Sequence, residues 1–259
     1  MSIPGSFPAS TIICQLNNLV SINFSSNSLW GTIPANLSSC SKLETLDLST
    51  NHLAGKIAGE LFSMKTLRSL NLQHNMFSGE ISTPMVAYSL ESLDLSSNHL
   101  NGSIPATLLR LHQLSHLSLA SNNLTGEIPA RLFDLLSLSS IDLSHNHLSG
   151  SIPRGFGELH QLQNIDVSYN KFSGDICESV SHMWDARLTL RMCKNHFSGR
   201  IPYELVKLKF VDTCLDHVNL CSEQLFSSSE QMVMELPTCP SQSFSGLYNS
   251  TAHKLQKFQ

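Results

Sequence analysis

The chain has 259 residues, of which 41% are hydrophobic and 14% are charged, and its formal net charge is −4. This apolar content is enough for a packed core. The negative net charge and the lack of a long basic run argue against nucleic-acid binding. No run of about 18 apolar residues occurs, so the sequence predicts no membrane span.

The sequence repeats itself with a period of about 24 residues, which is typical of a solenoid. The chain opens with a partial repeat over residues 1–18, and we expect eight full repeats over residues 19–208. Each full repeat carries an asparagine, a glycine four residues later and an isoleucine two residues after the glycine. These ladder asparagines are Asn27, Asn51, Asn75, Asn98, Asn122, Asn146, Asn170 and Asn195.

The residues before each ladder asparagine alternate between apolar and polar types, which predicts a half-buried strand. In the sixth repeat, Ile141 and Leu143 point to one side and Asp142 to the other. One coil cannot bury its leucines alone, so we expect neighbouring coils to stack and their strands to form a parallel sheet. We expect the ladder asparagines to be buried and to bond backbone groups where strand becomes turn. After the strand, Gly150 and Pro153 should turn the chain.

The full pattern is L-x-x-L-x-L-x-x-N-x-L-x-G-x-I-P-x-x-L-x-x-L, and it resembles the plant-type leucine-rich repeat over roughly Ile3 to Leu208. The G-x-I-P segment distinguishes this class from other leucine-rich repeats. The resemblance implies an α/β repeat solenoid. This would be a right-handed horseshoe with a parallel β-sheet on the concave face and short 3-10 turns on the convex side.

After the repeats the sequence changes character. An N-L-C segment ending at Cys221 and an L-P-T-C segment ending at Cys239 resemble the C-terminal cap of plant receptor kinases. The form is most similar to the HAESA-like class, whose ectodomains bind small secreted peptides. We therefore expect a cap over residues 209–239, with a disulfide between Cys221 and Cys239 and with Cys214 as the alternative partner. Residues 240–259 are polar and predict a flexible tail without an apolar span or a kinase motif.

Cysteine usage gives one further expectation inside the repeats. The chain has seven cysteines, an odd number. Cys40 occupies the repeat position that Met64, Leu111 and Leu135 hold in other coils. We therefore expect Cys40 to be a buried free thiol.

Five N-glycosylation sequons point to the secretory route. They are Asn23, Asn36, Asn101, Asn123 and Asn249. Residues 1–20 have neither the basic start nor the long apolar stretch of a signal peptide, and they begin in mid-repeat. We expect a fragment or truncated product, or else a short cytosolic form. The resemblance places the parent protein at the extracellular face of the plasma membrane or in the cell wall.

Polar positions on the predicted concave face form the candidate ligand-binding surface, because an extended polar array suits a peptide or a protein edge. Asp142 and Asp166 belong to this surface, although their family pattern favours a structural role. Side chains outside the pattern are better candidates for specificity. They are Gln73, His74, His116, His145 and Tyr169.

One contact of the resembled receptors is missing. Those receptors use an R-x-R pair on a late strand to hold the carboxylate of a peptide. Here Arg187 and Arg191 are four positions apart, and Arg191 and Lys194 are three apart. Neither is the i, i+2 pair that would point both side chains the same way. The sequence therefore predicts a site without this contact, or with the contact in repeats outside this chain.

Twelve histidines raise the question of metal binding or catalysis. Four of them directly follow a ladder asparagine, and they are His52, His99, His147 and His196. They recur in every second coil, roughly 10 Å apart, which is too far for shared metal ligation. No nucleophile with an oxyanion-stabilising element accompanies an Asp–His pair. We expect no metal, no cofactor and no enzymatic activity.

The leading hypothesis is a non-catalytic, ligand-binding region of a plant receptor-like kinase that lacks its kinase. The resemblance implies a peptide or protein ligand on the concave face and a leucine-rich-repeat co-receptor. A secreted inhibitor similar to polygalacturonase-inhibiting proteins is the alternative, although we expect this chain to lack their N-terminal cysteine cap. An ice-interacting protein would need a flat Thr- or Asn-rich array, which Asn71 and Asn164 alone do not make. A non-functional truncated product is the remaining hypothesis.

Overall fold

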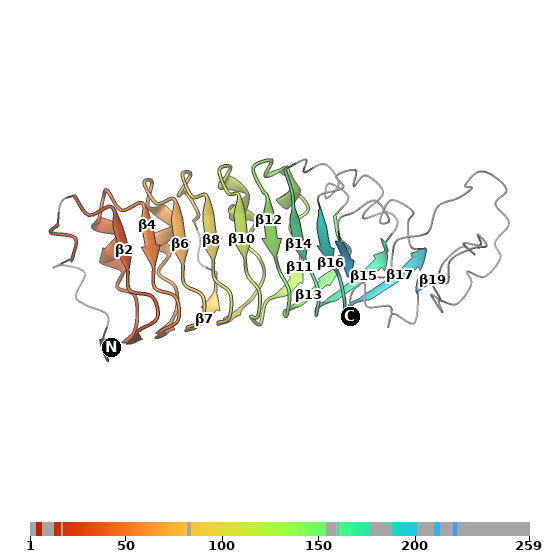
Figure 1. The fold of residues 1–259 in the computed structure, drawn as a ribbon, viewed down its shortest axis with the longest axis horizontal. Coiled ribbons are helices and arrows are strands. Elements are labelled where there is room, and N and C mark those ends of the chain that lie inside the picture. The colour runs from red at the N-terminus through yellow and green to blue at the C-terminus, as the bar shows by residue number, and fades with distance from the viewer. Residues whose placement is uncertain are drawn as a thin grey trace.

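The structure is a computed structural model, and it describes residues 4–6, 13–16, 18–81, 84–153, 159, 161–176, 188–200, 210–212 and 220–221. Within these residues the chain forms an elongated stack of coils, with one strand of each coil on the side facing the viewer in Figure 1. Of the predicted cap over residues 209–239, the structure describes only residues 210–212 and 220–221, as short strands. The predicted Cys221–Cys239 disulfide, the sequon Asn249 and the predicted tail lie outside the described residues. They stay predictions.

The principal sheet is parallel and, among the described residues, has nine strands. In chain order these are β2 (Ser21–Asn23), β4 (Thr45–Asp47), β6 (Ser69–Asn71), β8 (Ser92–Asp94), β10 (His116–Ser118), β12 (Ser140–Asp142), β14 (Asn164–Asp166), β16 (Thr189–Arg191) and β18 (Phe210–Asp212). Neighbouring strands pair in the register of the repeat, so Leu117 lies opposite Leu93 on one side and Ile141 on the other. These central residues are buried and form part of one continuous core. The predicted parallel sheet is confirmed.

A second row of parallel strands follows the ladder asparagines, and the sequence analysis did not predict it. One part contains β1 (Pro4–Ser6), β3 (Ser28–Gly31), β5 (His52–Gly55), β7 (Met76–Glu80) and β9 (His99–Asn101). The other part contains β11 (Thr125–Glu127), β13 (His147–Gly150), β15 (Lys171–Asp175), β17 (His196–Arg200) and β19 (Leu220–Cys221). Backbone hydrogen bonds join the parts, because Asn123 N–H donates to the Leu100 carbonyl and Thr125 N–H to the Gly102 carbonyl, both at 2.8 Å. We call this row the second sheet.

Short 3-10 helices close the coils on the side opposite the principal sheet. Those described are η1 (Ala35–Ser39), η2 (Gly59–Ser63), η3 (Ala106–Arg110) and η4 (Leu132–Asp134). In η1, η3 and η4, a proline of the G-x-I-P segment precedes the helix, and each helix buries a leucine against the core. Such tight turns let the chain return within a few residues. The predicted solenoid with 3-10 turns on its convex side is confirmed.

Seven of the eight ladder asparagines are buried and hydrogen-bonded as expected, and Asn27 is half-buried. The Asn122 side-chain amide donates to the carbonyls of Leu95, Leu119 and Ala120 at 3.0, 3.2 and 3.2 Å. Its Oδ1 accepts the N–H of Leu100 at 2.9 Å. One side chain thereby joins its own coil to the preceding coil. Asn51, Asn75, Asn98, Asn146, Asn170 and Asn195 make the same set of contacts in their coils.

The repeated glycine is needed for both conformation and space. Gly150 has φ +79°, in the left-handed region, and a Cβ there would lie 2.7 Å from Cγ of Glu127 in the preceding coil. The absence of a side chain lets the Glu127 side chain lie across this position.

The expectation of a free thiol at Cys40 is wrong. Cys40 is buried in its core column as predicted, but it forms a disulfide with Cys14, with a Cα–Cα distance of 4.7 Å. Cys14, which belongs to the partial repeat before the first full coil, thereby covers this core position. Closing a loop of this length contributes about 3 kcal/mol in the chain-entropy account. Cys193 is also disulfide-bonded.

Candidate functional site

The outer face of the principal sheet presents two side chains from each strand. In β12 these are Ser140 and Asp142, while Ile141 between them is buried. Strands lie about 4.8 Å apart, so the face forms a continuous polar surface with one step per coil. From β2 to β16, the positions that open the strands are Ser21, Thr45, Ser69, Ser92, His116, Ser140, Asn164 and Thr189. Those that close them are Asn23, Asp47, Asn71, Asp94, Ser118, Asp142, Asp166 and Arg191.

The aspartates that close the strands have a structural role. Oδ1 of Asp142 accepts the N–H of Ser144 at 3.0 Å, and Oδ1 of Asp166 accepts the N–H of Ser168 at 2.9 Å. The Ser168 hydroxyl donates to the same oxygen of Asp166. Such bonds to the backbone two residues on stabilise the turn after the strand. The structural interpretation favoured for these two candidates therefore has direct support.

The Asp142 carboxyl also has an altered acidity. Burial raises its pKa above the usual value, hydrogen bonds from Ser144 act in the opposite direction, and the charges of Asp166 and Asp94 raise it further. Register places Asp142 directly beside Asp166. Negative charge is therefore concentrated on this part of the sheet, and a cationic group of a ligand would be attracted to it.

His116 is the sequence candidate that lies on the sheet itself. It opens β10, is exposed, and lies between Ser92 and Ser140 of the neighbouring strands. Its Nδ1 is 2.8 Å from the Ser115 hydroxyl, which lies 2.9 Å from the Glu91 carbonyl. When the hydroxyl donates to that carbonyl, His116 carries its proton on Nδ1 and presents Nε2 to a ligand as an acceptor.

His74, His145 and Tyr169 do not lie on strands, which corrects the position expected for them. Each directly precedes a ladder asparagine and adopts a left-handed backbone conformation, with φ between 52° and 53°. This conformation turns the chain, so the asparagine points inward and the residue before it points outward. The rings of His145 and Tyr169 stack, with centroids 4.1 Å apart and an interplanar angle of 11°. These three candidates form an edge beside the sheet, not part of its face.

The remaining sequence candidate is less accessible. Gln73 is half-buried, and its N–H donates to Oδ1 of Asn71 at 3.1 Å.

On β16, Thr189 and Arg191 are the two outward positions. Register places Arg191 beside Asp166.

The sequence analysis missed an ion-pair network at the start of the strands. Arg68 lies between Glu44 and Glu91 of the adjacent coils, with nitrogen–oxygen distances of 3.7 and 2.5 Å. All three residues directly precede a strand, so a comparison of charges at this repeat position would have found it. Because the groups are exposed, their contribution to stability is small.

The described sequons lie on different sides of the solenoid. Asn23 closes β2 on the principal sheet, whereas Asn36 lies in η1 on the opposite side. Asn101 ends β9, and Asn123 follows a ladder asparagine in the next coil. All four are exposed.

The described residues contain neither a membrane-spanning helix nor a metal-type cluster of side chains. None of the helices in this part of the chain is both long and apolar enough to cross a membrane. Within the same residues, no three histidine, cysteine or acidic side chains come together as a metal site would require.

Comparison with protein-family models identifies leucine-rich repeats at residues 15–77, 89–111 and 121–172, which together make up more than half of the chain. Comparison with curated protein sequences gives no match. Solved structures match well.

One similar structure is the plant peptide hormone receptor RGFR1 in complex with RGF2, with 30% identity and a TM-score of 0.75 over 85% of this chain and 35% of the receptor chain. Another is the Arabidopsis receptor kinase HAESA in complex with the peptide hormone IDA and the co-receptor SERK1, with 29% identity and a TM-score of 0.66 over 86% of this chain and 41% of that chain. A plant ice-binding protein matches with 29% identity and a TM-score of 0.62 over 78% of this chain and 64% of that protein. The chain thus spans less than half the length of the two receptor chains.

Proposed function

Because the chain belongs to the leucine-rich-repeat family and carries the plant type of repeat, we propose that it is the ligand-binding region of a plant receptor ectodomain. Its ligand is an extended peptide that lies across the outer face of the principal sheet. The region acts by binding and not by catalysis. The peptide receptors among the similar structures support this reading, since they share the repeat and the solenoid.

The observation that carries the proposal is the departure from the repeat pattern between β10 and β16. In these coils His116 replaces the usual small residue on the sheet, and Tyr169 stacks on His145 at its edge. Tyr169 is 47% exposed, a large exposure for an aromatic side chain. Exposed aromatic residues often carry much of the binding energy of an interface. The acidic pair Asp142 and Asp166 lies between these features and favours a peptide with a basic side chain there.

The test is calorimetric titration of the full chain with a panel of synthetic secreted plant peptides. We expect at least one to bind, and we expect His116→Ala and Tyr169→Ala each to weaken it by about tenfold or more. His112→Ala is the matched control, because His112 is exposed and lies outside the strands. Equal affinity of all four proteins would place the peptide elsewhere, and no binding by the folded chain would refute the proposal.

The parent protein would then be a glycosylated receptor at the plasma membrane that signals with a leucine-rich-repeat co-receptor. The co-receptor in the HAESA complex motivates this part of the proposal. A pull-down of the full chain with a co-receptor ectodomain, with and without the bound peptide, tests it. Peptide-dependent capture is expected.

The alternative is inhibition of a cell-wall-degrading enzyme by the same face. The exposed polar surface of the sheet would fit a protein edge as well as a peptide. Inhibition of a polygalacturonase that is lost in His116→Ala would favour this function over the peptide receptor.

A further inference from the structure

The two residues that flank each ladder asparagine form a continuous exposed edge with an unusual composition. We call these residues the histidine strip. They are Ser26, Ser28, Thr50, His52, His74, Met76, Ser97, His99, Ser121, Asn123, His145, His147, Tyr169, Lys171, Lys194 and His196. The strip contains six of the twelve histidines of the chain and two lysines, but none of its 20 acidic residues. This is notable in a protein whose net charge is −4.

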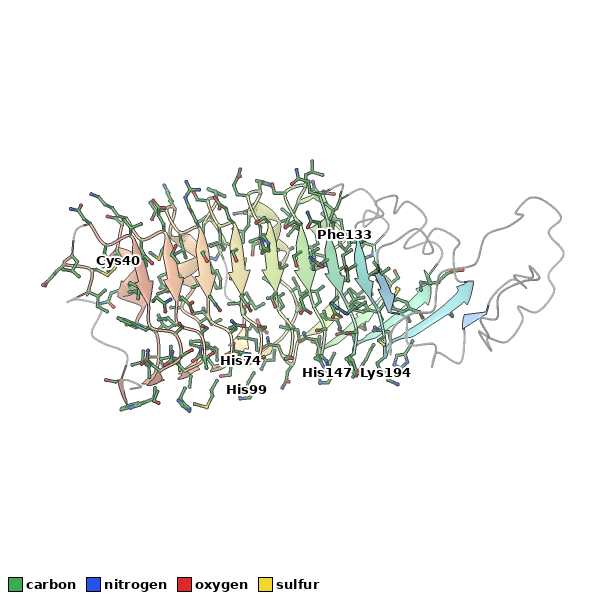
Figure 2. The ribbon with its side chains drawn as sticks, in the orientation of Figure 1. Cys40, His74, His99, Phe133, His147 and Lys194 are labelled. Atoms are coloured by element: carbon green, nitrogen blue, oxygen red, sulfur yellow. A yellow bond between two sulfur atoms is a disulfide. The ribbon has the colours of Figure 1, made fainter. Side chains whose placement is uncertain are left out.

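The backbone explains why these side chains share one edge. The residue before each ladder asparagine has φ between 52° and 55°, and the residue after it begins a strand of the second sheet in most coils. The asparagine between them is buried, so both neighbours point outward. Figure 2 shows His74, His99, His147 and Lys194 along the same long edge of the molecule. Eight coils at a spacing of about 4.8 Å make this edge about 34 Å long.

Carboxylates lie on both sides of the strip but not in it. On the principal sheet these are Asp47, Asp94, Asp142 and Asp166. On the second sheet they are Glu80, Glu127 and Asp175, with Lys56 among them. The Oδ1 atoms of the four aspartates accept backbone hydrogen bonds, which hold these carboxylates at the turns. The acidic side chains therefore lie on either side of the strip, and no acidic side chain interrupts its line of histidines and lysines.

Histidine side chains in general take up a proton between about pH 8 and pH 5. The strip thus places six imidazoles and two lysine ammonium groups in one line, so positive charge gained on acidification would add to that line. A narrow, straight line of positive charge fits a linear polymer with regularly spaced negative charges. The serine and threonine side chains in the strip can bond hydroxyl groups, and the exposed Tyr169 offers a ring face to a sugar.

We propose that the histidine strip binds a linear acidic polysaccharide, a polymer of uronic acids, under acidic conditions. The strip shares His74, His145 and Tyr169 with the candidates for the peptide site, but its remaining residues lie outside that site. The residues that follow the asparagines carry it independently, because none of them was a candidate for peptide binding.

The experiment measures binding of a polygalacturonate oligomer to the full chain by biolayer interferometry at about pH 5.5 and pH 7.5. We expect the dissociation constant to be about tenfold lower at the acidic pH and to rise with added salt. At the acidic pH, the triple variant His99→Ser, His147→Ser, Lys171→Ser should bind about tenfold more weakly. Serine is tolerated at this repeat position, since Ser28 holds it in the first full coil.

The control removes three exposed cations elsewhere, with Lys42→Ser, Lys65→Ser and Arg110→Ser, and should change the affinity by less than about twofold. Equal binding at both pH values, or unchanged binding by the first triple variant, would overturn the proposal. A DNA oligonucleotide of the same charge that bound equally well would overturn the assignment to a polysaccharide. Loss of peptide binding in Tyr169→Ala with the polymer still bound would separate this site from the proposed function.

Discussion

The buried asparagines and the exposed residues beside them are neighbours in sequence but obey different constraints. Asn122 satisfies backbone groups of two coils, and its replacement would affect both. Asn123 is exposed, and the corresponding positions in other coils hold serine, histidine, methionine or lysine. The comparison teaches that the repeat specifies the interior of each coil and leaves the adjacent edge free to acquire binding residues.

The largest effect is expected from Asn122→Ala. The change leaves three carbonyls and one N–H without their partner inside the core, so we expect it to lower the free energy of unfolding by about 3 kcal/mol. Urea denaturation followed by circular dichroism measures this.

The matched control is Asn123→Ala, the same change one residue later on the exposed edge. We expect a change of less than about 0.5 kcal/mol. Similar destabilisation by the two variants would break the distinction between interior and edge.

A smaller and opposite effect is expected at Thr50. This β-branched residue has φ 54°, a conformation that asparagine tolerates better. Thr50→Asn should therefore stabilise the chain by about 1 kcal/mol in urea denaturation. Tyr169→Asn relieves the same strain but loses the stack on His145, so its net effect should be close to zero. A clear gain in stability from Tyr169→Asn would show that the stack contributes little.

The asparagines and their neighbours also show which features of the fold the sequence predicted and which it did not. The period predicted the parallel sheet and the buried asparagines, because each repeats in register, and the resemblance to plant-type leucine-rich repeats implied the 3-10 turns. The left-handed turn could not be predicted, since serine, threonine, histidine, tyrosine and lysine occupy it in place of the expected glycine or asparagine.

Two further features needed the three-dimensional arrangement. The second sheet was missed because Gly150 and Pro153 indicate a turn, although the residues before the glycine pair with the next coil. The Cys14–Cys40 disulfide was missed because Cys14 lies in a partial repeat, where the period gives no position for it. For the candidate site, His116 is exposed on the sheet as predicted and Gln73 is half-buried, whereas the exposed His74, His145 and Tyr169 lie at the edge of the sheet and not on it.

The smallest effect is expected at Asp142, which belongs neither to the buried interior nor to the exposed edge. Its carboxylate stabilises a turn, and its side chain is half-buried on the candidate site. Its pKa is raised mainly by burial, so the ionised carboxylate is less favourable in the folded state than in the unfolded state. Stability is therefore lost as pH rises from the pKa of Asp142 in the unfolded chain through its raised pKa in the folded chain, and it is recovered on acidification.

Asn71 accepts the equivalent hydrogen bond in its coil, so Asp142→Asn keeps the turn and removes the charge. We expect this variant to be more stable than the parent by about 0.5 kcal/mol at neutral pH, since solvent screens a half-buried charge, and the gain should vanish below about pH 4. Asp142→Ala is the control, because it removes both the charge and the bond to Ser144 and should be destabilising at every pH. A gain from Asp142→Asn that persisted at low pH would mean that the charge is not its cause.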